Sequence, residues 1–156
     1  MMVGKKILIA DYDSAYLETL AGLFEAKGLQ VVRAADGREA YEKYRTERPD
    51  LILVEAMLPK LHGFDLAARI HSETKGSIPV VILTGLYKGA QYRNEALRSF
   101  GAAAYLEKPI DSERIVGTVE ALLREESDFD AELPDPASVA SMLAEHLEKI
   151  SKGESD

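Results

Sequence analysis

The chain alternates short apolar runs with longer amphipathic stretches. The apolar runs lie at residues 5–10, 30–33, 51–54, 79–83 and 103–106. Apolar side chains spaced three and four positions apart, which is helical spacing, follow these runs at residues 15–27, 38–47, 65–72, 90–99 and 112–124. The runs ILIA, LILV and VVIL do not alternate with polar residues, as expected for parallel strands covered by helices on both faces. The pattern predicts an α/β fold: a doubly wound, five-stranded parallel sheet.

The predicted domain ends near residue 124, and the chain after it differs in charge. Residues 1–124 carry 17 Lys and Arg and 17 Asp and Glu, whereas residues 125–156 carry two Lys and ten Asp and Glu. The entire formal charge of −8 therefore lies in this tail. We interpret residues 125–135 as an acidic linker and residues 136–156 as a C-terminal amphipathic helix and tail.

One apolar seam runs along the predicted C-terminal helix, formed by Ala140, Leu143, Leu147 and Ile150. Two heptads are too few to predict a coiled coil. Docking onto the helix's own domain, docking onto a partner and formation of a homodimer therefore stay open, beside the simpler interpretation of a solubilising tail.

Composition excludes several classes of protein and site. The chain of 156 residues contains no cysteine, which excludes a disulfide framework, a thiolate zinc site and a cysteine nucleophile. No apolar run approaches the roughly 20 residues of a membrane span, and the N-terminal run is too short for a signal peptide. The acidic tail disfavours nucleic acid and anionic membranes as partners. We expect a cytoplasmic protein.

Polar side chains stand where the predicted strands end, which is where parallel α/β sheets bind ligands. These residues are Asp11, Tyr12 and Asp13 after the first strand, Glu55 after the third, Thr84 after the fourth and Lys108 after the fifth. Carboxylates from two strand ends that face a hydroxyl and an ammonium could hold a hard cation and a phosphoryl group.

Taken together, these segments resemble the receiver domain of two-component response regulators. The resemblance covers about residues 5–124 and rests on the segments ILIADYD, AADGREA, PDLILVEAMLPKLHGFDL, VVILTG and FGAAAYLEKPID. It implies the flavodoxin-like (βα)5 receiver fold, here with an extra C-terminal helix.

The resemblance also implies roles for single residues. In this family an aspartate after the third strand accepts a phosphoryl group from a histidine kinase. Magnesium is held by that aspartate, by an acidic pair after the first strand and by a backbone carbonyl. The residues that match by position are Asp11, the backbone of Met57, Thr84, Lys108 and the aromatic switch residue Tyr105.

Two positions depart from the family pattern. Glu55 stands in place of the phosphoacceptor aspartate, and Tyr12 replaces the second acid of the pair, so a metal-ligand position is lost. The extra methylene of Glu55 displaces the reacting oxygen by about 1 Å, which can cost about 100-fold in rate. Asp13 could substitute as a metal ligand, but we favour it as the cap of the first helix. We therefore expect no cofactor, or only weak Mg2+ binding.

Three roles are open for Glu55. Its carboxylate could imitate a phosphoryl group near Thr84 and Lys108, it could fill the pocket as a stable polar plug, or it could retain residual phosphoacceptor activity. For Tyr12 we expect a structural role, with the ring over the space left by the metal and the hydroxyl bonded to Asp11 or Lys108.

We expect the chain to act as a signal-transduction module that binds a protein partner, either a histidine kinase or an effector, without control by phosphorylation. Tyr87, Tyr92 and Tyr105 are the candidate interface residues, because the resembled family pairs through this face. In this interpretation the chain is not an enzyme. The alternative is a receiver that is phosphorylated at Glu55 with Mg2+. A flavodoxin-like cofactor carrier is poorly supported, because no glycine-rich phosphate loop follows the first strand.

Overall fold

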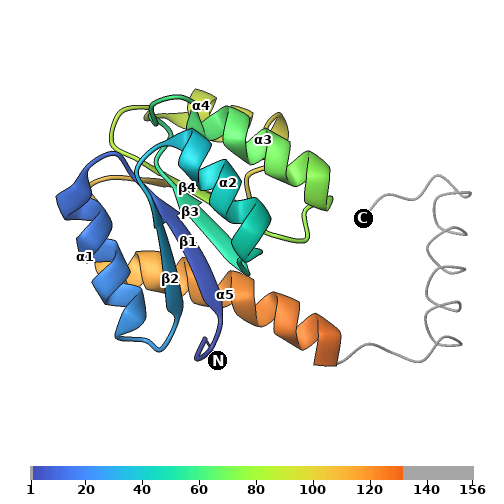
Figure 1. Cartoon of the computed structure of the whole chain (residues 1–156). Helices are drawn as coiled ribbons and strands as arrows, with labels where there is room; N and C mark the ends of the chain where they lie inside the picture. The colour runs from blue at the N-terminus through green and yellow to red at the C-terminus, as the bar shows by residue number, and fades with distance from the viewer. Residues whose placement is uncertain (1, 132–156) are drawn as a thin grey trace, which may run out of the picture. The chain divides into compact units, whose positions relative to one another are not determined.

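The structure, a computed structural model, describes residues 2–131, in which strands and helices alternate (Figure 1). The strands are β1 (Lys6–Ala10), β2 (Gln30–Ala34), β3 (Leu51–Val54), β4 (Val80–Thr84) and β5 (Ala104–Glu107). The helices are α1 (Ser14–Glu25), α2 (Gly37–Glu47), α3 (Gly63–Thr74), α4 (Ala90–Arg98) and α5 (Ser112–Ala131). The predicted strand–helix units are confirmed, with most bounds shifted by one or two residues.

The five strands form one parallel sheet in the order β2-β1-β3-β4-β5. The chain order reverses direction beside β1, where β2 lies on one side and β3 on the other. This is the doubly wound topology that the sequence predicts, and the point of reversal is where such sheets bind ligands.

Two apolar cores flank the sheet, because every residue of β3 and β4 and most of β1 is buried. Helices α1 and α5 pack on one face, where Phe24 and Val119 lie in the core. Helices α2, α3 and α4 pack on the other face, where Tyr44 and Ile70 are fully buried. Figure 1 shows the two helical layers on either side of the strands. Burial on both faces explains why the strand sequences lack alternation.

The loop between β3 and α3 is held against the start of α2. A Cβ atom added at Gly37 would lie 1.9 Å from the carbonyl oxygen of Leu61, so only glycine allows this approach. The Gly37 amide also donates to the carbonyl of Pro59 over 2.9 Å. The loop that follows Glu55 is therefore fixed by backbone contacts to a second element.

The last helix is longer than the sequence pattern predicts. Helix α5 continues to Ala131, so residues 125–131, which we interpret as part of an acidic linker, are helical. No glycine or proline interrupts the chain between Gly117 and Pro134, which allows the helix to continue. The predicted helix and tail at residues 136–156, with their apolar seam, lie outside the described residues.

None of the helices in the described part of the chain is long and apolar enough to cross a membrane.

Candidate functional site

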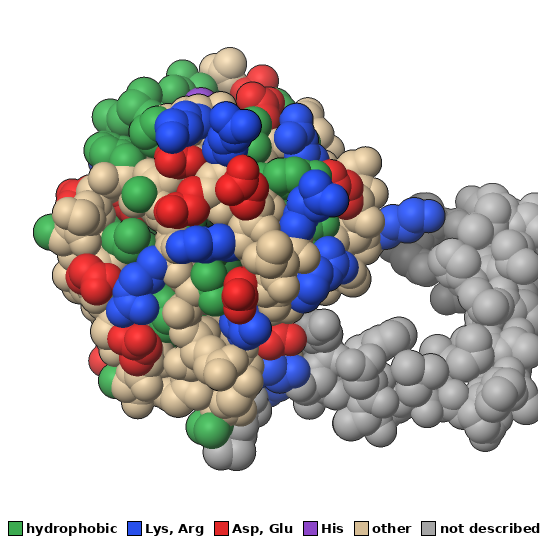
Figure 2. Space-filling view, in the orientation of Figure 1, with side chains coloured by type: hydrophobic (Ala, Val, Ile, Leu, Met, Phe, Trp, Pro, Cys, Tyr) green, Lys and Arg blue, Asp and Glu red, His purple; other side chains and the backbone are tan. Residues whose placement is uncertain are grey.

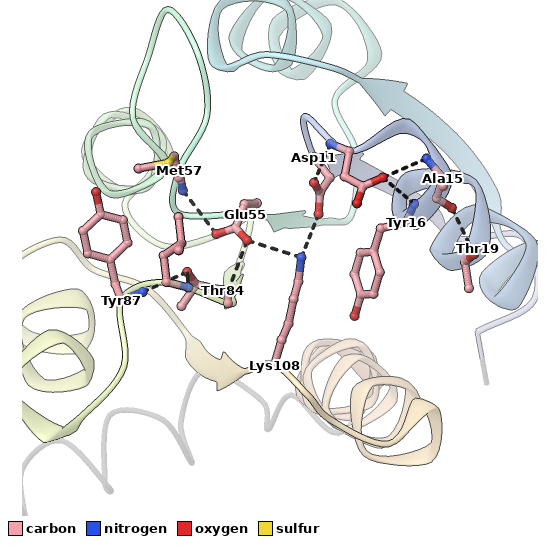
Figure 3. Close-up of polar contacts among 12 residues, drawn as sticks. Asp11, Ala15, Tyr16, Thr19, Glu55, Met57, Thr84, Tyr87 and Lys108 are labelled. Atoms are coloured by element: carbon pink, nitrogen blue, oxygen red, sulfur yellow. Dashed lines mark hydrogen bonds and ion pairs between the residues drawn. The ribbon is translucent and has the colours of Figure 1, made fainter.

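Four polar side chains meet at the carboxyl edge of the sheet (Figure 3). They are Asp11 just after β1, Glu55 just after β3, Thr84 at the end of β4 and Lys108 just after β5. The parallel register pairs Ala10 with Val54 and Thr84 with Glu107, which brings the next residues of these strands to one edge. The structure thus places these four residues, which the sequence analysis singles out, at one edge of the sheet.

Lys108 forms ion pairs with both carboxylates. Its Nζ lies 3.1 Å from Asp11 Oδ2 and 3.3 Å from Glu55 Oε1. Both carboxylate side chains are only 3% exposed, and the lysine side chain is 21% exposed. Such buried carboxylates need a counter-ion, because an unpaired charge in the interior is strongly unfavourable. One ammonium therefore joins the ends of β1, β3 and β5.

The electrostatics of the ion triad, defined as Asp11, Glu55 and Lys108, follow from this burial. Burial raises the pKa of the Asp11 carboxyl, and the Asp13 amide and the Lys108 charge offset this only in part. Burial lowers the pKa of the Lys108 ammonium, but Asp11 and then Glu55 outweigh it, so the net shift is upward. The lysine is thus held in its charged form.

The carboxylate of Glu55 has a partner at each oxygen. Oε1 accepts a hydrogen bond from the Gly85 amide over 3.3 Å, in addition to its ion pair with Lys108. Oε2 accepts from the Met57 amide over 3.2 Å. The Glu55 side chain is therefore tied to the loops after β3 and β4 as well as to Lys108 (Figure 3).

Thr84 takes part in a different set of contacts from those that the sequence suggests. Its fully buried Oγ1 accepts from the amides of Leu86 at 3.2 Å and Tyr87 at 3.4 Å. Among the described residues it forms no hydrogen bond with Glu55. The amide of Gly85, which carries no sequence signal, makes the contact with Glu55 instead.

Asp13 caps the first helix, as the sequence predicts. Its Oδ1 accepts from the amides of Ala15 at 3.0 Å and Tyr16 at 3.2 Å. Its own amide donates to Asp11 Oδ1 over 2.9 Å. These bonds fix the loop after β1 and use the Asp13 carboxylate for helix capping.

Tyr12 does not cover the site, so that expectation is wrong. Its side chain is 51% exposed and forms no hydrogen bond within the described residues. Tyr16, in the first turn of α1, covers the site instead (Figure 3), and its ring centroid lies 3.9 Å from Lys108 Nζ. Tyr16 packs against the core between α1 and the sheet, whereas Tyr12 lies in the loop before the helix cap Asp13.

The residues at this edge offer Mg2+ fewer ligands than the family resemblance implies. Magnesium requires near-octahedral oxygen coordination. The two carboxylates already share the Lys108 ammonium, and the position of a third carboxylate holds the exposed Tyr12. Within residues 2–131, no group of three His, Asp or Glu side chains is arranged to hold a metal ion.

Tyr105, the predicted switch residue, points into the domain. Its hydroxyl donates to the carbonyl of Tyr87, and its ring packs edge-on against Phe64 with 6.0 Å between centroids. Burial raises the pKa of Tyr105 to about 12. Since Tyr105 is only 6% exposed, it offers no surface to a partner in this structure, contrary to its assignment as an interface residue.

Tyr87 and Tyr92, the other candidate interface residues, are partly buried and pack against each other at 5.3 Å. Tyr87 also contacts the ring of His62, a loop residue for which the sequence indicates no metal-binding or catalytic role. His62 Nδ1 accepts from the Phe64 amide over 3.2 Å and so caps α3. The sequence signal for this capping role is the position of His62 directly before Gly63, where α3 begins.

The mouth of the site carries exposed apolar side chains. Tyr12, Met57 and Leu86 are 51%, 42% and 57% exposed, and they lie on the loops after β1, β3 and β4. Each belongs to a loop that also contributes to the hydrogen bonds around the ion triad. We call these three side chains the apolar rim.

Known proteins match this chain over the same region. Protein PilH of Pseudomonas aeruginosa is 32% identical over 76% of this chain and 97% of its own length. The alkaline phosphatase synthesis transcriptional regulatory protein PhoP of Bacillus subtilis is 34% identical over 78% of this chain and 50% of its own length. The chain thus spans about half the length of that regulator.

Solved structures share the fold. The receiver domain of the Francisella response regulator 1452 gives a TM-score of 0.73 at 29% identity, covering 78% of this chain and 98% of that one. A two-component response regulator from Clostridium difficile gives 0.71 at 32% identity, covering 77% and 96%. The sequence profile of the response regulator receiver domain matches residues 7–120. The chain therefore belongs to the response regulator receiver domains of two-component signalling.

Proposed function

We propose that this receiver domain works as a protein-interaction module whose state is not set by phosphorylation. The proposal rests on the contacts of Glu55. Its two carboxylate oxygens already have Lys108 and the backbone amides of Met57 and Gly85 as partners. These contacts stabilise the carboxylate and orient it toward the protein, which opposes its use as a nucleophile. The substitution of Tyr12 for a carboxylate removes charge that a divalent cation would need.

The contacts of Glu55 support a filled pocket and also a partial imitation of a phosphoryl group. A carboxylate offers one negative charge, whereas a phosphoryl group offers about 1.5 to 2. The contact with Lys108 is made, but Thr84 binds its own loop. Since only part of the expected set of contacts is present, we propose that Glu55 acts mainly as a structural plug that keeps the domain in one state.

The partner is proposed to be a protein, either a histidine kinase or an effector. The apolar rim of Tyr12, Met57 and Leu86 supports this, as do the partly buried tyrosines Tyr87 and Tyr92. The competing proposal is a phosphoacceptor at Glu55, which is favoured by the convergence of Asp11 and Lys108 on that side chain.

Intact-mass spectrometry after incubation with Mg2+ and acetyl phosphate separates the two proposals. The natural chain is compared with Glu55→Asp and with the double variant Tyr12→Asp, Glu55→Asp. We expect the double variant to gain one phosphoryl group and the natural chain to gain none. Modification of the natural chain at Glu55 would overturn the proposal in favour of the phosphoacceptor.

A Mg2+ titration gives an independent readout. A ligand that binds only the folded state raises the midpoint of thermal unfolding, and the rise grows with the ratio of the ligand concentration to its Kd. We expect millimolar Mg2+ to stabilise the double variant and to leave the natural chain unchanged. An equal shift in both proteins would show that Tyr12 and Glu55 do not prevent metal binding.

A further inference from the structure

We infer that the surface between α2 and α3 binds an acidic segment of a partner protein. A cavity of about 460 Å³ lies there, lined by Arg38, Tyr41, Glu42, Arg45, Lys60, Leu61 and Arg69. We call it the α2–α3 pocket. It lies on the opposite face of the sheet from α1 and α5, and the inference holds whether or not Glu55 accepts a phosphoryl group.

Two of its arginines are held in place without a carboxylate partner. The guanidinium carbons of Arg45 and Arg69 lie 5.8 Å and 5.0 Å from the centre of the Tyr41 ring. Cation–π contacts of this length are favourable and orient the guanidinium group. Within the described residues, neither arginine forms an ion pair. Both therefore present unused donors to solvent.

The ring that carries them is itself fixed. The hydroxyl of Tyr41 donates to Glu73 Oε2 over 2.5 Å, and the hydroxyl of Tyr44 donates to Oε1 over 3.1 Å. The Tyr41 hydrogen bond holds the pKa of Glu73 below its usual value. Glu73 is thus hydrogen-bonded to two phenols, and the nearby charges of Arg45 and Arg69 lower its pKa further. Within the described residues neither guanidinium donates a hydrogen bond to it, so their donors can bind another anion.

The remaining cations are only weakly compensated. Arg38 Nε lies 3.8 Å from Glu42 Oε1, and Lys60 Nζ lies 3.4 Å from Asp36 Oδ2. Both cationic side chains are well exposed. Exposed ion pairs of this kind contribute little to stability, so each cation can pair with another anion instead. Figure 2 shows Lys and Arg side chains over α2 and α3, with acidic side chains among them.

The spacing of the cations selects the kind of ligand. Arg38 and Arg45 are seven residues apart on α2, which corresponds to about 10 Å along the helix. One phosphate or one carboxylate cannot reach both. An acidic helix with glutamates at i, i+4 and i+7 presents carboxylates over a similar length, and Tyr41 and Leu61 offer an apolar surface between them.

A nucleic acid fits less well. Glu42 lies within the pocket and would face phosphates. Repulsion from Glu42 acts against a polyanion of high charge density, whereas a short acidic segment with apolar residues tolerates one acidic neighbour.

The test measures binding of a fluorescent helical peptide of about 15 residues, with glutamates at i, i+4 and i+7, to the full-length protein. A peptide with glutamine at these positions is the ligand control. The charge-reversal variant is Arg45→Glu with Arg69→Glu. The matched control is Arg98→Glu with Arg114→Glu, in which Arg98 occupies the last turn of α4 as Arg45 does in α2.

We expect the glutamate peptide to bind and the glutamine peptide not to bind. The Arg45 and Arg69 variant should lose affinity by about tenfold or more, and the matched control by less than about twofold, because like charges placed in an interface are strongly unfavourable. Raising the salt concentration should weaken binding of the natural protein.

Three results would overturn the inference: no binding of the glutamate peptide, equal losses in the two variants, or tighter binding of a single-stranded oligonucleotide of the same charge. Thermal unfolding monitored by circular dichroism verifies that the variants fold. If charge reversal unfolds the protein, Arg45→Gln with Arg69→Gln replaces it, and the same comparison with Arg98→Gln and Arg114→Gln decides.

Discussion

The ring of Tyr16 lies against the ammonium of Lys108, with 3.9 Å between Nζ and the ring centroid. The ring comes from α1 and the lysine follows β5, so the contact joins residues that are far apart in sequence. It covers a side of the ammonium that the carboxylates do not occupy (Figure 3). Tyr16 thereby shields the ion triad from solvent and strengthens its electrostatic interactions.

Replacement of Tyr16 by leucine should lower the free energy of unfolding by about 1 kcal/mol, since a partly shielded cation–π contact has this size. Urea unfolding followed by circular dichroism measures the change. Tyr12→Leu is the matched control, because Tyr12 is half-exposed and should alter stability by less than about 0.5 kcal/mol. Equal effects of the two substitutions would contradict a specific role of Tyr16.

Replacement of Lys108 by methionine should be much more damaging. It leaves Asp11 and Glu55 buried without a counter-ion, which costs about 3–5 kcal/mol. The control is Lys60→Met, since Lys60 forms an exposed pair with Asp36 and should change stability by at most about 1 kcal/mol. Adding Glu55→Gln to Lys108→Met should recover part of the loss. Failure of this rescue would show that the cost comes from packing.

Alkaline pH should destabilise the protein through Tyr105. Its folded-state pKa is about 12, against an ordinary value of 10.0, so the unfolded chain ionises first. The resulting stability is complete below pH 10 and is lost as the pH rises to 12, with a loss of about 1.4 kcal/mol by pH 11. Urea unfolding of the natural chain and of Tyr105→Phe at pH 9 and pH 11 measures it. An equal loss of stability between pH 9 and pH 11 in the two proteins would argue against the role of Tyr105.

Gly37 and Gly22 should respond oppositely to alanine. A Cβ atom at Gly37 would meet the Leu61 backbone at 1.9 Å, so Gly37→Ala should destabilise by about 1–3 kcal/mol or more. Gly22 lies within α1 with nothing within 4 Å of its added Cβ, so Gly22→Ala should stabilise by about 0.5–1 kcal/mol. Thermal melts compare the two. A neutral Gly37→Ala would mean that the loop after β3 moves easily.

The fold and the convergence of the site could be predicted from the sequence, because both depend on where apolar runs begin and end. Asp11, Glu55 and Lys108 each follow directly after a strand, and parallel strands end at one edge. Asp13 was also predictable as a helix cap, since its residue type and its place before a helical pattern carry that signal.

The finer contacts could not be predicted. Backbone amides such as those of Met57 and Gly85 carry no sequence signal, and they bind Glu55 only because the loops bring them there. The choice between Tyr12 and Tyr16 depends on the rotation of α1. The helical conformation of residues 125–131 could not be predicted from their acidic composition, which is equally typical of a linker, although no glycine or proline stops a helix there.

The carboxylate of Glu55 has a further consequence for local opening motions. The amide protons of Met57 and Gly85 belong to different loops, yet both are bonded to this one side chain. Their exchange with deuterium should therefore be governed by a shared opening event in which the Glu55 side chain leaves the pocket. A substitution at Lys108 that loosens Glu55 should accelerate both amides together. A single glutamate thus couples the opening kinetics of two loops that lie far apart in the sequence.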